Sequence, residues 1–216
     1  MIELTHFSVV VLAQTHNPTI LNPDFLRNTG IVPGEYKIKN FICTPPIAQV
    51  IYEEGISVIA EFEKIQFVDE LLERLPHESP IPQIAVNYIR TLPYVKYTAA
   101  GINFAGHRRF SDHEAVRAFI RKRFVKEGPW TNSQNEAIDI GLNFVYSSGT
   151  VKRTININPG EYKKTEEDSG PIVVLRYNHH LAVPPNDTDA IAAFVLDWEN
   201  AFKQYVEFSD NIFAGV

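Results

Sequence analysis

The basic side chains between His107 and Lys126 are the densest group of residues in this sequence that could do chemistry. Seven lysines and arginines occur there, against two acids, Asp112 and Glu114. Positive side chains along one face of a helix can bind phosphate oxygens or an acidic protein surface. An ordinary solvated face, or pairing with carboxylates of the same chain, would use the same residues. The candidate binding residues are Arg108, Arg109, Arg117, Arg121, Lys122 and Lys126.

A second candidate is a set of asparagines in segments with strand-like alternation. If residues 138–147 and 151–158 pair as a hairpin, Asn143 and Asn156 share the face opposite the aliphatic core. Amides both donate and accept hydrogen bonds, so a curved sheet lined with them could hold a polar ligand or a peptide. An antiparallel sheet also commonly shows one polar face to water without binding anything. Further members of this face, depending on register, are Asn103, Asn158 and either Arg176 or Asn178.

The histidines give little support for catalysis or metal binding. His107 and His113 flank the start of the basic segment together with Asp112, whereas His179 and His180 are adjacent and would point to opposite faces of a strand. The chain contains no HExxH, GxSxG, GxGxxG or GxxxxGK[ST] pattern. We therefore expect no metal and no cofactor, and the sequence favours a non-enzymatic protein over an enzyme.

Composition and charge indicate a soluble protein. The single cysteine, Cys43, excludes an intrachain disulfide and a cysteine-built zinc site, which fits a reducing compartment. The formal net charge is -6, and residues 1–93 hold 6 basic against 11 acidic side chains. The amino terminus does not have the pattern of a secretory signal, and no segment approaches the ~18 apolar residues of a membrane span. We expect a cytoplasmic protein that does not enter a membrane.

The elements that must position these residues follow the same order twice. Residues 1–93 predict a strand at 6–14, a short helix after Asn22-Pro23-Asp24, and a helix at 81–92. Between the two helices, the predicted strands are 37–44, 47–52, 56–62 and 65–68.

Residues 94–216 predict a strand, a basic helix, a hairpin, a strand and a long final helix. Ser111 and Glu114 have the spacing of a capping box at the start of the basic helix. The hairpin arms, 138–147 and 151–158, flank Ser148-Gly149, and a charged loop is expected at 159–170. The next strand is 172–181, and one long helix follows from about residue 186.

This order predicts an α+β protein. We expect two pseudo-repeated halves, 1–93 and 94–216, which share one curved antiparallel sheet with helices on one face. The junction at 90–94 is too short and too apolar for a flexible linker. The order resembles the repeated unit of TATA-binding-protein-like (TBP-like) folds and also the helix-grip fold. The resemblance concerns topology, and a shared fold does not establish a function.

Three functions remain open from the sequence. The first is a non-enzymatic binding or adaptor protein in a protein assembly, acting through a protein partner or through self-association as an oligomer. The second is a nucleic-acid-associated protein that uses the basic helix at 108–126. The third is a small-ligand-binding protein or enzyme with a pocket between the sheet and the long C-terminal helix, and with His107, Arg109 and Asp112 at its mouth.

Overall fold

The chain is an α+β protein, as the sequence predicts. The computed structural model describes residues 2–70, 74–131, 138–184 and 187–215. Within these residues, a nine-stranded antiparallel sheet carries five α-helices. The strands are β1 (Glu3–Ala13), β2 (Ile38–Thr44), β3 (Ile47–Tyr52), β4 (Ile56–Glu61), β5 (Lys64–Asp69), β6 (Tyr97–Arg109), β7 (Leu142–Ser148), β8 (Val151–Lys163) and β9 (Ser169–Ala182). The helices are α1 (Pro23–Asn28), α2 (Ile81–Thr91), α3 (His113–Phe124), α4 (Thr188–Leu196) and α5 (Trp198–Phe213), with 3-10 turns η1 (Pro18–Ile20), η2 (Pro76–Glu78) and η3 (Pro129–Thr131).

The strand order is β2-β3-β4-β5-β1-β6-β9-β8-β7. The first strand of each predicted half, β1 and β6, therefore pair with each other inside the sheet. The other strands of residues 1–93 lie on the β1 side, and the other strands of residues 94–216 lie on the β6 side. The sheet is continuous across the junction between the two segments.

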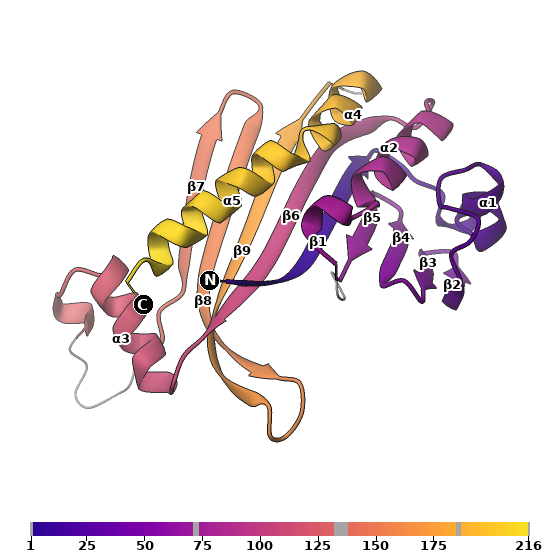
Figure 1. Cartoon of the computed structure of the whole chain (residues 1–216). Coiled ribbons are helices and arrows are strands. Elements are labelled where there is room, and N and C mark those ends of the chain that lie inside the picture. Colours follow the sequence, from indigo (N-terminus) through magenta and orange to yellow (C-terminus); the bar gives the residue numbers. More distant parts are fainter. Residues whose placement is uncertain (1, 71–73, 132–137, 185–186, 216) are drawn as a thin grey trace.

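The helices α2, α4 and α5 lie on the same face of the sheet (Figure 1). Alternate residues of each strand point to this face and form the core, as Phe7 and Val9 of β1 do. The Phe7 ring stacks on Phe104 of β6 at 4.9 Å between centroids and contacts Trp198 of α5 at 5.1 Å. The opposite face, which we call the open face, carries the intervening residues of each strand, beginning with Ser8 and Val10 of β1.

Local signals correctly predict several boundaries. Asn22 is the N-cap of α1, and its side chain accepts a hydrogen bond from the Phe25 amide at 2.8 Å. Gly149 has a φ of +57° in the turn between β7 and β8, where a left-handed residue is required. The pairing of this hairpin puts Asn143 opposite Asn156, as the alternation predicts.

The predicted capping box at Ser111 is wrong. The N-cap of α3 is Asp112, whose carboxylate accepts a hydrogen bond from the Ala115 amide at 2.8 Å. Ser111 instead donates its hydroxyl proton to Asp112 Oδ2 at 2.9 Å. Aspartate and serine are both strong N-caps, so adjacent candidates leave the first residue of the helix ambiguous by one position.

Three other predictions need correction. The first hairpin arm begins at Leu142 rather than at residue 138. The expected charged loop at 159–170 is mostly strand, because β8 continues to Lys163 and β9 begins at Ser169. The end of this β8–β9 hairpin extends beyond the rest of the sheet (Figure 1). The long C-terminal helix is two helices, α4 and α5, separated at Asp197, and residues 188–213 contain no proline or glycine that would signal this break.

Candidate functional site

The first two residues of the predicted basic face, Arg108 and Arg109, lie on opposite sides of the sheet. Arg108 and Arg109 are consecutive residues of β6 and therefore point to opposite faces. The Arg108 guanidinium lies over the Phe213 ring on the helix side, 5.7 Å from its centroid. The Arg109 guanidinium lies over the Tyr162 ring at 4.0 Å and contacts Asp168 at 2.5 Å. The two arginines therefore do not act on a common ligand.

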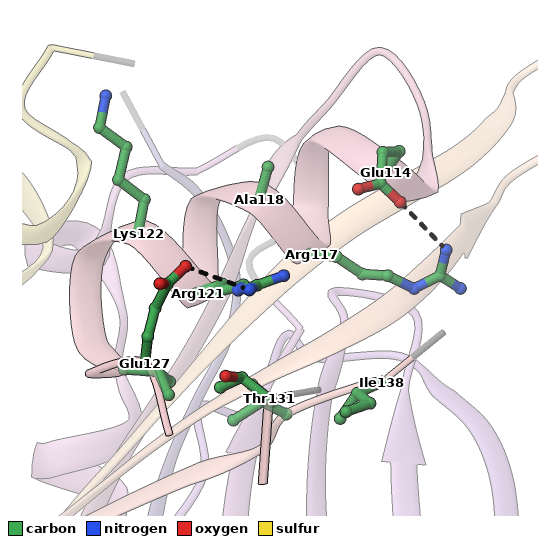
Figure 2. Close-up of a pocket in the computed structure, with 10 residues that line it drawn as sticks. Glu114, Arg117, Ala118, Arg121, Lys122, Glu127, Thr131 and Ile138 are labelled. Atoms are coloured by element: carbon green, nitrogen blue, oxygen red, sulfur yellow. Dashed lines mark hydrogen bonds and ion pairs between the residues drawn. The ribbon is translucent and has the colours of Figure 1, made fainter. Parts of the chain in front are cut away.

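Two arginines of α3, Arg117 and Arg121, contact carboxylates of the same chain, and Arg123 donates to the Asn211 carbonyl. Arg117 Nε lies 3.0 Å from Asp139. Figure 2 shows the contacts of Arg117 with Glu114, at 3.7 Å, and of Arg121 with Glu127, at 3.2 Å. A hollow of about 620 Å³ is lined by α3 and by Thr131, Ile138 and Ile140. Figure 2 shows Lys122 extending away from the Arg121–Glu127 pair.

These contacts reduce the positive field of α3. Lys122 and Lys126 form no ion pair within the described residues, whereas Arg117 and Arg121 each have a nearby carboxylate. Exposed ion pairs of this kind are weak, and they leave less net charge for a phosphate backbone. Pairing with carboxylates of the same chain therefore accounts for much of the predicted basic face.

The predicted asparagines come together on the open face. Asn103 of β6 and Asn156 of β8 both line a hollow of about 580 Å³. Asn143 of β7 lies directly opposite Asn156 at the edge of the sheet. Residues opposite each other in paired strands share a face, so the three amides are on one surface.

A chain of hydrogen bonds crosses three strands beneath this hollow. The Asn178 amide of β9 donates to Asn103 Oδ1 at 2.6 Å, and the Asn103 amide donates to Ser8 Oγ at 3.3 Å. Ser8 Oγ lies 3.0 Å from His6 Nε2. Since the Ser8 oxygen accepts from Asn103, its proton can be donated to a neutral His6 ring.

The surroundings of His6 favour that neutral form. Burial lowers the pKa of His6, although the Glu70 and Asp69 carboxylates act in the opposite direction, and the positive charge of Arg176 lowers it further. The Ser8 side chain is only 3% exposed and is already hydrogen bonded on both sides. A substrate carbonyl has little access to this hydroxyl, so the arrangement suits a rigid binding surface better than nucleophilic catalysis.

Arg176 lies beside this chain of hydrogen bonds. In β9 it is opposite Ala105 of β6 and Asn156 of β8, so one row across the open face contains His6, Ala105, Arg176, Asn156 and Asn143. Within the described residues, its guanidinium forms no ion pair and no hydrogen bond. The exposed guanidinium thus remains available to a ligand.

The sequence predicted either Arg176 or Asn178 on this face, and the choice between them is wrong. The two residues are two positions apart on β9, so both point to the open face, and both line the hollow. His6 and Ser8 are not among the site residues predicted from the sequence. The alternation of His6, Phe7, Ser8 and Val9 was the available signal.

The remaining histidines are dispersed. The His107 ring stacks on Tyr162 on the open side, His113 contacts Glu161 at 2.9 Å, and His179 packs against Phe194 on the helix side. In the described part of the chain, no three histidine, cysteine, aspartate or glutamate side chains converge as a metal site requires.

The space between the sheet and α5 is occupied by aromatic side chains. The Phe104 ring contacts Phe202 at 5.2 Å and Tyr205 at 5.6 Å between centroids. Tyr177 also lies against Tyr205, at 6.0 Å. His107, which was expected at the mouth of a pocket here, lies on the other side of the sheet.

Comparisons with known proteins do not extend this description. No protein-family model matches the chain, and no curated protein matches it. None of the helices in the described ranges combines the length and the apolar character that a membrane crossing needs.

Proposed function

We propose that this chain is a non-enzymatic binding protein of a protein assembly, and that it holds its partner on the open face of the sheet. The observation that carries the proposal is the hollow bordered by the hydrogen-bonded Asn178–Asn103–Ser8–His6 chain and by the unpaired Arg176. A preorganised row of donors and acceptors on a rigid sheet lowers the entropic cost of binding.

The composition of the open face supports a protein partner. Beyond β1, the open-face residues of β2, β3 and β4 include Ile42, Ile47, Ile51 and Ile59. The Ile42 side chain is 47% exposed and the Ile47 side chain is 37% exposed. An apolar area next to a polar area with an arginine is the anatomy of a protein–protein interface.

Charge gives less support to a nucleic acid partner. The chain has a formal net charge of -6, and Arg109, Arg117 and Arg121 contact carboxylates. A nucleic acid would have to compete with these internal contacts and would meet an acidic protein. The basic helix is therefore the weaker of the two candidate surfaces.

The strand order supports the finer topology predicted from the sequence. In each segment, 1–93 and 94–216, the first strand lies at the centre and the last strand lies next to it. We therefore propose that the segments are related halves of a TBP-like or helix-grip-like arrangement that together form one cytoplasmic globular unit.

Site-specific photo-crosslinking tests the proposed surface. A photoreactive phenylalanine would replace Gln66 or Lys152, which lie on the open face, and Lys203 or Glu207, which are exposed on α5. In cells of the source organism, we expect the two open-face positions to crosslink to the same polypeptide and the two α5 positions to give much less of that product. Equal crosslinking from α5, crosslinking only to nucleic acid, or no product from the open face would contradict the proposal.

A further inference from the structure

The setting of Arg176 differs from that of three arginines in the predicted binding set, Arg109, Arg117 and Arg121. Arg109, Arg117 and Arg121 each lie within 4.0 Å of a carboxylate of the same chain. Among the described residues, the Arg176 guanidinium has no such neighbour and no hydrogen bond. Guanidinium presents a planar fork of donors that matches a carboxylate, so Arg176 is suited to receive one from outside the chain.

Neutral donors flank this guanidinium. Asn156 lies directly opposite Arg176 in the sheet, and Asn143 lies directly opposite Asn156. Neither amide makes a side-chain hydrogen bond within the described residues. On the other side, Asn103 and Asn178 bond to each other, which fixes that wall of the hollow. A carboxylate on Arg176 would therefore have free amide donors beside it, and a peptide backbone could use the same groups.

The charge of the hollow fits a single carboxylate rather than a polyanion. Arg176 is the only lysine or arginine among the residues that line it. Burial lowers the pKa of His6, which favours the uncharged ring. Glu3 and Glu70 lie near this end of β1, and Glu3 contacts His107 at 3.6 Å. One unpaired positive charge close to these acids would not balance several phosphates.

The size of the hollow is also informative. At about 580 Å³ it lies within the range of about 300–1,000 Å³ that is typical of ligand sites. It could hold a short stretch of extended chain, and the apolar area on β3 and β4 continues along the same face.

We propose that the hollow binds a segment of the partner protein that carries a single aspartate or glutamate, with the carboxylate of that residue on Arg176 and Asn156. This inference rests on the proposed function, because it names the chemistry of the partner at the same face. The hydrogen bonds of the Asn178–Asn103–Ser8–His6 chain fix one wall of the hollow, and they need not break when the carboxylate binds.

Nuclear magnetic resonance titration with small peptides tests the chemistry independently of the natural partner. The probes are acetyl-Gly-Glu-Gly-amide, its glutamine isostere acetyl-Gly-Gln-Gly-amide, inorganic phosphate and a single-stranded oligothymidylate. We expect the glutamate peptide to cause saturable shifts of the Asn156 side-chain amide and the Arg176 Nε proton, with the glutamine peptide binding at least about tenfold more weakly.

Two variants separate a specific contact from general attraction. Arg176→Gln should weaken binding of the glutamate peptide by at least about tenfold. Lys152→Gln removes one positive charge from another row of the same face and should change it less than about twofold, because exposed charges act weakly at a distance. Equal effects of the two variants, equal binding of both peptides, or tighter binding of phosphate or oligothymidylate at Asn156 would overturn the inference.

The crosslinked partner distinguishes failure of this inference from failure of the proposed function. If Gln66 and Lys152 positions still crosslink to one polypeptide when Arg176→Gln is introduced, with unchanged yield, the open face binds a protein and the carboxylate contact is wrong. If the open-face positions give no partner at all, the proposed function itself is wrong. A crosslinking yield that is lower in Arg176→Gln than in the same photoreactive protein with Arg176 intact supports both the proposed function and the carboxylate contact.

Discussion

His16 should make this protein sensitive to mild acid. The side chain is 1% exposed, and neither ring nitrogen has a hydrogen-bond partner of normal geometry within the described residues. Its neighbours are the rings of Tyr88 and Tyr97, at 6.3 and 6.0 Å between centroids. Burial lowers the pKa of His16 from 6.5 to about 4, with the Val11 backbone acting in the opposite direction.

The sign of the effect follows from proton binding by the two states. Between pH 6.5 and about 4, His16 is protonated in the unfolded chain and neutral in the folded one. The unfolded state therefore binds more protons, and the free energy of unfolding falls as the pH falls. At about 1.36 kcal/mol per pH unit, the loss over this window is about 3 kcal/mol, which is a large part of a typical domain stability. Above pH 6.5 this contribution is fully retained.

Urea unfolding of wild type and His16→Phe, at pH values from about 7 to about 4.5, measures this contribution. We expect the wild type to lose about 2–3 kcal/mol more than the variant over that range. His113→Gln, at an exposed position on α3, is the control and should follow the wild type. If the difference between wild type and His16→Phe does not change with pH, His16 is not buried as a neutral ring and the reasoning is refuted.

Three further predictions concern single residues of β6 and of the start of α3. Gly106→Ala should lower the free energy of unfolding by about 1–3 kcal/mol, because a Cβ there would lie 2.6 Å from both the Glu3 carbonyl and the Tyr205 hydroxyl. In the control, Gly170→Ala, the added Cβ would meet no atom within 4 Å, so thermal unfolding should show little change. Arg109→Gln should speed amide hydrogen exchange at the end of the β8–β9 hairpin, since Arg109 contacts Asp168 and Tyr162 there. The control Lys163→Gln, which breaks the exposed pair with Glu166, should leave this exchange unchanged. Unchanged exchange in both variants would contradict this role of Arg109. Asp112→Ala should lower the unfolding midpoint more than Ser111→Ala, and the reverse order would restore the capping box predicted from the sequence.

The parts of the fold that the sequence predicts correctly depend on short-range chemistry. Asn22 and Pro23 determine the start of α1, and Gly149 determines the turn that pairs Asn143 with Asn156. In both cases the decisive interactions lie within a few residues. The α+β class follows because such local elements, added in order, leave few arrangements that bury their apolar faces.

The site needed information that only tertiary pairing supplies. Asn103 and Asn178 are 75 positions apart, and their contact depends on the register between β6 and β9. A shift of one residue in that register would move one of the two side chains to the core face. The break between α4 and α5 at Asp197 likewise has no glycine or proline signal, so no local rule would place it.

The basic segment shows why closeness in sequence misleads about function. Its seven cations begin on a strand, where Arg108 and Arg109 point to opposite faces. They continue on α3, where two of the three arginines contact carboxylates of the same chain. Much of this charge is therefore used inside the molecule. Arg176 stands between leucine and tyrosine in the sequence, yet the sheet brings it beside Asn156 with no internal partner among the described residues. For recognition, an isolated charge that folding leaves unpaired is more informative than closeness of basic residues in the sequence, because a ligand at the isolated charge displaces no carboxylate of the same chain.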